Sequence, residues 1–458
     1  MTDATLENAP NRFVRRETLQ QQPAPLSVAG PIAWIRTNLF SGPVGTILTL
    51  LSLYIVVVAV EDLVRFYIID AVWTGASREA CLADKVGRPV GACWPYVTDR
   101  FQYFVYGSYP VAERWRVNIV FVMFALGVAW LLWNKAPQKK LGAFFFFVML
   151  PLSGFILLLG GATAESLLRV LLLISAALAV VYAVASFVPS VAVWTSAPRR
   201  VAEQDLSPWR RFAGPKILIL MALVIFGLVG VLNEQIGLPR VDTGLWGGMM
   251  VTFLISAVGI VFSLPFGVVL ALGRRSRLPI IQLLSVIFIE FVRGVPLITV
   301  LFMANTMLPL FVPQEYSPDR LLRPLIGVAL FASAYMAEVI RGGLQAIPKG
   351  QFEGAMSLGL GYWQMMRLII LPQAMRIVIP GIVNTFIGLF KDTTLVTIVG
   401  IFDFLNTIQA TLVDPTWATP TTRTTGYAFA ALFYFLCCWG MSRYSIAVEK
   451  RLAAGQKR

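Results

Sequence analysis

Long, nearly uncharged apolar runs dominate this sequence and restrict its fold more than any other feature. A helix needs about 20 apolar residues to cross a hydrocarbon layer of about 30 Å, and only helices or closed barrels satisfy their backbone in lipid. The runs are too long and continuous for barrel strands, so we expect an all-α polytopic membrane protein. Ten spans are predicted, near residues 43–60, 117–133, 141–161, 167–188, 217–236, 247–272, 288–311, 324–342, 377–401 and 426–446.

The composition agrees with a lipid environment and excludes several kinds of site. The chain is 57% hydrophobic and 14% charged, whereas a soluble domain carries about 25% charged residues. Its formal net charge of +14 is best explained by basic cytoplasmic loops, because no basic stripe carries exposed aromatics; no nucleic-acid partner is expected. With no histidine and no CxxC pair among four cysteines, we expect no metal site.

Lysine and arginine collect before the first predicted span and after the second, fourth, sixth, eighth and tenth. Basic loops face the cytoplasm, so the sequence predicts a multi-pass protein of the inner membrane with both termini cytoplasmic. The expected segments are a cytoplasmic tail (1–40), a membrane extension of about four helices (41–196) with an extracytoplasmic loop (61–116), a cytoplasmic linker (197–216), an additional helix (217–244) and a core (245–448).

The predicted extracytoplasmic loop contains two cysteines, Cys81 and Cys93, in the stretch "CLADKVGRPVGAC". Oxidising conditions outside the cytoplasm and a short flexible gap favour a disulfide between them. Two free thiols are the alternative.

A polar stretch interrupts the apolar runs at 351–372, "QFEGAMSLGLGYWQMMRLIILP". It predicts a short helix from Gln351 to Leu358, a sharp turn at Gly359 and Gly361, and a second helix ended by Pro372. Such a helix-turn-helix could dock on a soluble partner as a lever, or lie on the membrane surface as an amphipathic helix.

The stretch has the spacing E-x-A-x3-G-x9-I-x-L-P, which resembles the EAA loop through which ABC importer permeases engage their ATPase subunits, here at 343–375. Gly354 replaces the middle alanine. "FIEFVRGVPLITVLF" (288–302) and "LFKDTTLVTIVG" (389–400) resemble two further motifs of the polar amino-acid branch. Residues 245–448 thus resemble the type I ABC importer permease core. The extension is similar to that of the long permeases of general L-amino-acid or glutamate/glutamine/aspartate/asparagine transporters.

The resemblance implies a non-catalytic permease subunit that forms half of the pore of an ATP-driven amino-acid importer. Its partners would be a homologous permease in a heterodimer, two ABC ATPase subunits that hold ATP and Mg, an extracytoplasmic solute-binding protein and the amino-acid substrate. No cofactor is expected on this chain, which lacks a GxxxxGK[ST] motif. The alternative is an ion-coupled secondary transporter acting without an ATPase, but such proteins often contain inverted repeats, and none is evident.

The resemblance also assigns site residues. The expected ATPase-coupling residues are Glu353, Ala355, Leu358, Gly359, Gly361, Leu371 and Pro372. The expected pathway residues are Lys391, Asp392, Thr393, Thr394, Glu338, Arg293, Thr299 and Asn305. Asp392 would accept from a substrate ammonium, with a structural Lys391–Asp392 arrangement as the alternative.

Four of these assignments rest on charge and polarity inside the membrane, where each charge is costly unless paired or hydrated. Glu290 and Arg293 are three residues apart and can pair. A structural ion pair within the helix or with another helix is expected, and a gate or a carboxylate contact through Arg293 is the alternative. Glu338 is expected to pair with Arg341 or to line the pathway. Thr299 and Asn305 line the path or bond across helices.

Overall fold

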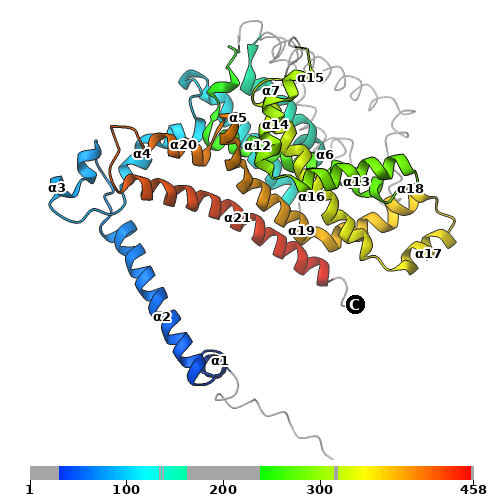
Figure 1. Ribbon diagram of the computed structural model, residues 1–458, viewed down its shortest axis with the longest axis horizontal. Coiled ribbons are helices and arrows are strands. Elements are labelled where there is room, and N and C mark those ends of the chain that lie inside the picture. The colour runs from blue at the N-terminus through cyan, green and yellow to red at the C-terminus, as the bar shows by residue number, and fades with distance from the viewer. Residues whose placement is uncertain (1–29, 134–135, 137–138, 162–237, 314–317, 455–458) are drawn as a thin grey trace, which may run out of the picture.

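The computed structural model describes residues 30–133, 136, 139–161, 238–313 and 318–454, which are almost entirely helical (Figure 1). The N-terminal part contains α1 (Pro31–Asn38), α2 (Pro43–Val64), the π-helical turn η1 (Arg65–Ile69), η2 (Arg78–Cys81), α3 (Ala83–Val86), α4 (Trp94–Tyr106), η3 (Val111–Glu113), α5 (Arg114–Leu132), α6 (Lys139–Phe144), η4 (Phe145–Met149) and α7 (Leu150–Leu159).

The C-terminal part begins with a 3-10 turn, η5 (Thr243–Leu245). It continues with α12 (Gly248–Arg274), α13 (Pro279–Gly294), α14 (Leu297–Thr306), α15 (Leu308–Phe311), α16 (Leu322–Gln345), α17 (Lys349–Ser357), α18 (Tyr362–Met365), η7 (Met366–Ile370), α19 (Leu371–Asp392), η8 (Thr393–Val399), β1 (Phe402–Asp403), α20 (Phe404–Thr411) and α21 (Thr422–Ala454).

Seven of the described helical stretches are long and apolar enough to cross a membrane, and an eighth is obtained if one bent pair counts as a span. Each overlaps a predicted span, so the all-α polytopic prediction is confirmed. The predicted spans at 167–188 and 217–236 lie outside the described residues.

The prediction of one span over 288–311 is wrong in detail. The structure forms two helices there, α13 and α14, which are bent by 107° relative to each other. The break falls at Val295, whose extended backbone (φ −111°, ψ 137°) is the conformation that a following proline imposes. Gly294 and Pro296 flank it, and both disfavour a continuous helix.

The prediction that Pro372 ends a helix is also wrong. The chain stays helical from α18 through η7 into α19, so Tyr362–Val399 forms one long stretch. Pro372 lies in the first turn of α19, directly after the π-helical turn Met366–Ile370. A π-helical turn changes the hydrogen-bond register, and it accommodates a residue that has no N–H to donate.

We name the two ends of the helical bundle after a feature of each, the disulfide and α17. The disulfide end comprises residues 70–107 and 402–421, and the α17 end comprises residues 273–279 and 345–362. These segments lie at opposite ends in Figure 1. Cys81 and Cys93 form a disulfide, with their Cα atoms 5.7 Å apart.

The disulfide end is a packed structure rather than an open loop. Tyr96 and Phe104 of α4 are fully buried and belong to one apolar cluster with Phe404 and Ile408 of α20. The Tyr96 hydroxyl lies 2.6 Å from the hydroxyl of Thr411, and burial raises the pKa of Tyr96 to about 12. Helix α4 of the N-terminal part therefore packs on α20, the short helix before α21.

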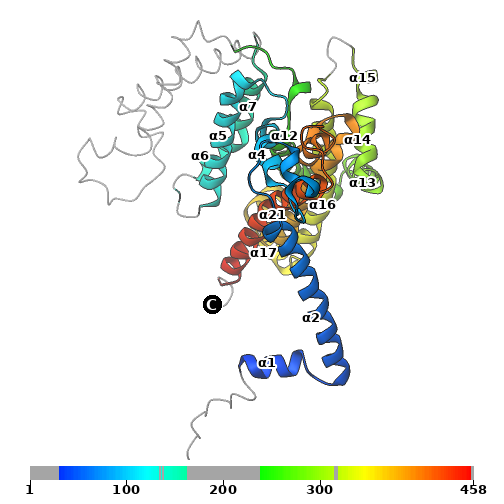
Figure 2. The ribbon, with the colours of Figure 1, turned by 90° about the vertical axis from the view of Figure 1, so that its left-hand side faces the viewer.

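A buried arginine joins the N-terminal helices to the start of the core. Arg116 of α5 is fully buried; its guanidinium is 2.6 Å from Glu113 and donates to the carbonyl of Pro239 (3.0 Å). The left-handed Gly160 (φ +63°) lets the chain pass this contact, since a Cβ there would lie 2.4 Å from the same carbonyl. By contrast, no side chain of α2 is buried, and this helix extends away from the bundle (Figure 2).

Candidate functional site

The first candidate site is α17, which occupies the polar stretch singled out in the sequence. The helix follows Pro348 and is followed by Gly359, which has a left-handed backbone (φ 71°). Ala355 is almost fully buried, whereas Glu353 is exposed and Leu358 is 75% exposed. The small alanine therefore lets the helix pack closely on the bundle while its other side chains form an accessible surface.

Two contacts attach α17 to its neighbours. The amide of Gln373 donates to Gln351 (3.0 Å), and the guanidinium of Arg275 lies over the ring of Phe352, 5.6 Å from its centre. The turn that follows is closed by Gln364, whose side chain accepts from the N–H of Gly361 (3.2 Å). Leu371 is half-buried and Pro372 is exposed.

A cluster of five charged residues lies between α12, α13 and α16. Its centre is Glu338, with a side chain only 14% exposed, which contacts Arg274 (2.7 Å), Arg341 (2.7 Å) and Arg293 (3.5 Å). The predicted pairing of Glu338 with Arg341 is therefore present.

Glu290 and Arg293 do not pair with each other; each forms the interhelical kind of structural pair that was also expected. Glu290 instead pairs with Arg274 of α12 (2.8 Å), and Arg293 faces Glu338 and the ring of Tyr335 on α16. Spacing on one helix makes a pair possible, but here the neighbouring helices offer closer partners.

The second candidate site is the junction of α19 and η8, where the four residues Lys391–Thr394 lie. The hydroxyl of Thr393 donates to the carbonyl of Phe390 (2.8 Å), and that of Thr394 donates to the carbonyl of Lys391 (3.0 Å). Asp392 is half-buried and forms no ion pair or hydrogen bond with the part of the chain that the structure describes. No ion pair joins Lys391 and Asp392 in the described structure, and both the substrate role and the structural role of these residues stay predictions.

The other predicted pathway residues lie on α14, which packs against η8. Thr299 is exposed. The backbone carbonyl of Asn305 accepts from Arg323 (3.2 Å), while its buried side-chain oxygen has no hydrogen-bond partner among the residues that the structure describes. Neither side chain bonds across to another described helix, although their helix packs against η8, the element that follows Asp392.

Three residues that were not predicted support this junction. Asp403 is fully buried and accepts from the N–H of Asn406 (3.0 Å) and the hydroxyl of Tyr434 (2.8 Å). Asn406 donates in turn to the carbonyl of Thr394 (2.9 Å). Burial raises the pKa of Asp403, and these hydrogen bonds oppose the rise. The sequence signal was the aspartate at the N-cap of α20.

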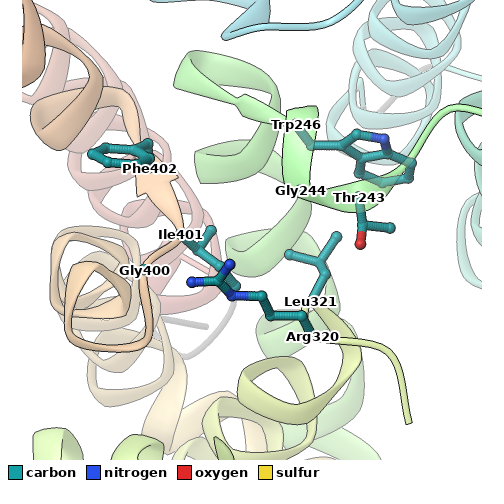
Figure 3. A pocket seen from close by; sticks show the side chains of 8 residues that line it. All are labelled: Thr243, Gly244, Trp246, Arg320, Leu321, Gly400, Ile401 and Phe402. Carbon is teal, nitrogen blue, oxygen red and sulfur yellow. The ribbon is translucent and has the colours of Figure 1, made fainter.

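Arg320 holds the other end of η8. Its guanidinium donates to the carbonyl of Val399 (3.3 and 3.2 Å), beside the left-handed Gly400 (φ 72°) (Figure 3). A Cβ on Gly400 would lie 2.1 Å from the Arg320 guanidinium. The pocket between Arg320, Trp246 and Phe402 has a volume of only about 10 Å³, roughly the space of one water, so it is not the site of an amino acid.

Comparison with known proteins decides what these sites belong to. Residues 263–453 match the family described as "binding-protein-dependent transport system inner membrane component". The inner membrane amino-acid ABC transporter permease protein YhdY of Escherichia coli is 40% identical over 435 residues, which cover 95% of this chain and 96% of that protein. The chain belongs to the amino-acid ABC transporter permeases.

A second relative of this permease family has a similar length. The glutamate/glutamine/aspartate/asparagine transport system permease protein BztC of Rhodobacter capsulatus is 41% identical over 449 residues, covering 96% of this chain and 98% of that protein. A crystal structure of an amino acid ABC transporter with histidines is 28% identical and covers 44% of this chain and 92% of its own, with a TM-score of 0.39. The two relatives confirm the predicted family and favour it over the ion-coupled secondary transporter. The permease is a multi-pass protein of the inner membrane.

Proposed function

We propose that this permease forms one half of the translocation pore of an ATP-driven amino-acid importer and passes the motion of its ATPase partners to the substrate pathway. One observation carries the proposal: a single helical stretch, Tyr362–Val399, leads from the turn after α17 to Asp392 and Thr394. A displacement at one end of such a stretch reaches the other without crossing a loop.

The α17 surface is proposed as the docking site for an ATPase subunit. Leu358 and Trp363 are 75% and 70% exposed, and Glu353 of α17 is exposed as well. Exposed large apolar side chains rimmed by polar residues mark a protein interaction site. ATP and Mg would be held and ATP hydrolysed by two such partners, and this chain would remain non-catalytic and free of cofactors.

The Asp392 carboxylate is proposed to receive the ammonium group of the amino acid. It is half-buried and unpaired within the described structure, and an unpaired charge at membrane depth is costly unless it has a functional partner. Thr394 is partly exposed and already donates its hydroxyl proton to the backbone, so its oxygen remains as an acceptor, whereas Thr393 is buried.

The remaining partners follow from this assignment. A homologous permease would supply the second half of the pore in a heterodimer, and a solute-binding protein would deliver the amino acid at the disulfide end. That end would face outward, where a disulfide persists, and the α17 end and both termini would face the cytoplasm.

Purification of the importer through a tag on this chain tests the proposal. We expect the wild type to retain its ATPase subunits. Glu353→Lys and Gly359→Val should disconnect ATP hydrolysis from transport while the spans stay inserted, and Asp392→Asn should impair uptake more than assembly. Full ATP-driven uptake by both α17 variants would refute the coupling assignment.

A further inference from the structure

The end of α12 carries two consecutive arginines that contact different parts of the molecule. Arg275 donates to the carbonyl of Leu344 near the end of α16 (3.2 Å), and its guanidinium lies 5.6 Å from the ring centre of Phe352 on α17. One side chain therefore connects the ends of α12 and α16 with the proposed ATPase-docking helix.

Arg274 reaches the charged cluster instead. It is 2.8 Å from Glu290 on α13 and 2.7 Å from Glu338 on α16. Glu338 has two further arginine contacts, Arg341 and Arg293, but Arg274 is the sole ion-pair partner of Glu290 among the described residues. Arg274 is thus the residue that joins Glu290 of α13 to α12 and, through Glu338, to α16.

The helix that Arg274 contacts through Glu290 is one that leads to the proposed substrate pathway. α13 continues through the 107° bend into α14, which packs against η8, the element that follows Asp392. Since Arg274 and Arg275 are adjacent on the last turn of one helix, a displacement of α17 that moves Arg275 also moves Arg274.

We propose that Arg274 and Arg275 form a second coupling link, which transmits movement of α17 to α13 and α14 in addition to the direct connection through α19. They are positioning residues, because neither is assigned a contact with the substrate or with ATP. This inference rests on the proposed function, since it requires α17 to be moved by an ATPase partner. Coupling of this kind needs contacts that differ between two global states, and ion pairs and a stacked guanidinium can exchange partners between states.

The test compares three variants in the whole importer, purified through this chain and reconstituted in liposomes with its binding protein and an amino acid. Arg274→Gln and Arg275→Gln each remove one of the described sets of contacts. Arg277→Gln is the matched control, because Arg277 makes the same charge change near the same helix end and has no ion pair, hydrogen bond or ring contact within the described residues. Amino acid transported and ATP hydrolysed are measured on the same vesicles.

We expect Arg274→Gln and Arg275→Gln to lower the amount of amino acid moved per ATP by about fivefold or more, with ATP hydrolysis and subunit yield retained and Arg277→Gln unchanged. Arg275→Lys, which keeps the charge but loses the planar stacking group, should show an intermediate loss. The inference is overturned if the ratio stays at the wild-type value, if it falls equally in Arg277→Gln, or if the arginine variants fail to assemble and so are structural. Absence of ATP-driven uptake by the wild-type complex would instead refute the proposed function.

Discussion

Two glycines of the α17 region can each be replaced by alanine, one in a helical and one in a left-handed backbone conformation. Gly354 lies in the interior of the helix, and Gly359 lies just beyond its end with a left-handed backbone (φ +71°). A Cβ added at either position would meet nothing within 4 Å. Replacement by alanine therefore differs between the two sites only in backbone conformation.

The expected free energies have opposite signs. In a helix interior, alanine is more favourable than glycine by about 0.5–1 kcal/mol, so Gly354→Ala should stabilise α17. In the left-handed region a side chain costs about 1–2 kcal/mol, so Gly359→Ala should destabilise the turn that ends the helix. Converted to populations, Gly354→Ala lowers the opening of α17 about two- to fivefold, and Gly359→Ala raises it about five- to thirtyfold.

Hydrogen exchange of the α17 amides, measured by mass spectrometry on the permease in lipid nanodiscs, reads this opening directly. Gly354→Ala should slow exchange and Gly359→Ala should accelerate it, while the amides of α16 exchange as in the wild type. A shift in the same direction for both variants would refute the reasoning, because it would mean that backbone conformation does not control the stability of this helix. Gly354→Ala should also preserve or increase ATP-driven uptake.

Three further predictions concern other parts of the molecule. Asp392→Asn should reduce uptake about tenfold, because one lost charge-assisted contact costs about 1.4 kcal/mol. The yield of the complex should stay normal, and uptake at the wild-type rate would contradict the substrate assignment. Replacing Cys81 and Cys93 by serine should lower the unfolding free energy of the disulfide end by about 2–3 kcal/mol, measured by limited proteolysis, and unchanged resistance would contradict it. Hydrogen bonds from Thr416, together with the charge of Arg100, hold the pKa of Asp414 below its usual 3.8, so its stabilising contribution is present above that pH and is lost as the pH falls further. The wild type should then lose thermal stability in acid more steeply than Asp414→Asn, and parallel curves would contradict this.

The membrane architecture was readable from the sequence because lipid imposes one rule on every span. The described spans lie where uninterrupted apolar length predicted them. The bend between α13 and α14 was signalled by Gly294 and Pro296, but hydropathy averages over such local signals and predicted a straight helix. Pro372 shows the opposite error: a local rule predicted a helix end, and the π-helical turn before it kept the helix continuous.

The helix and turn at α17 were predicted closely because their signals are local. A short polar helix followed by a left-handed glycine follows from residue types at fixed spacing, whereas the burial of Ala355 was not predicted. The charged cluster was predicted only in part. Glu338 pairs with Arg341 as expected, but the interhelical partners depend on which helices become neighbours. Glu290 finds Arg274, and Asn406 finds the carbonyl of Thr394, across separations that no periodicity encodes.

The central claim is that this permease moves amino acids only as part of an ATP-driven complex. Uptake of a labelled amino acid into proteoliposomes tests it most directly, with the purified chain alone and with the complete complex and its binding protein. We predict that uptake requires the complex and ATP and is indifferent to an imposed sodium or proton gradient. Gradient-driven uptake by the purified chain alone would contradict the account.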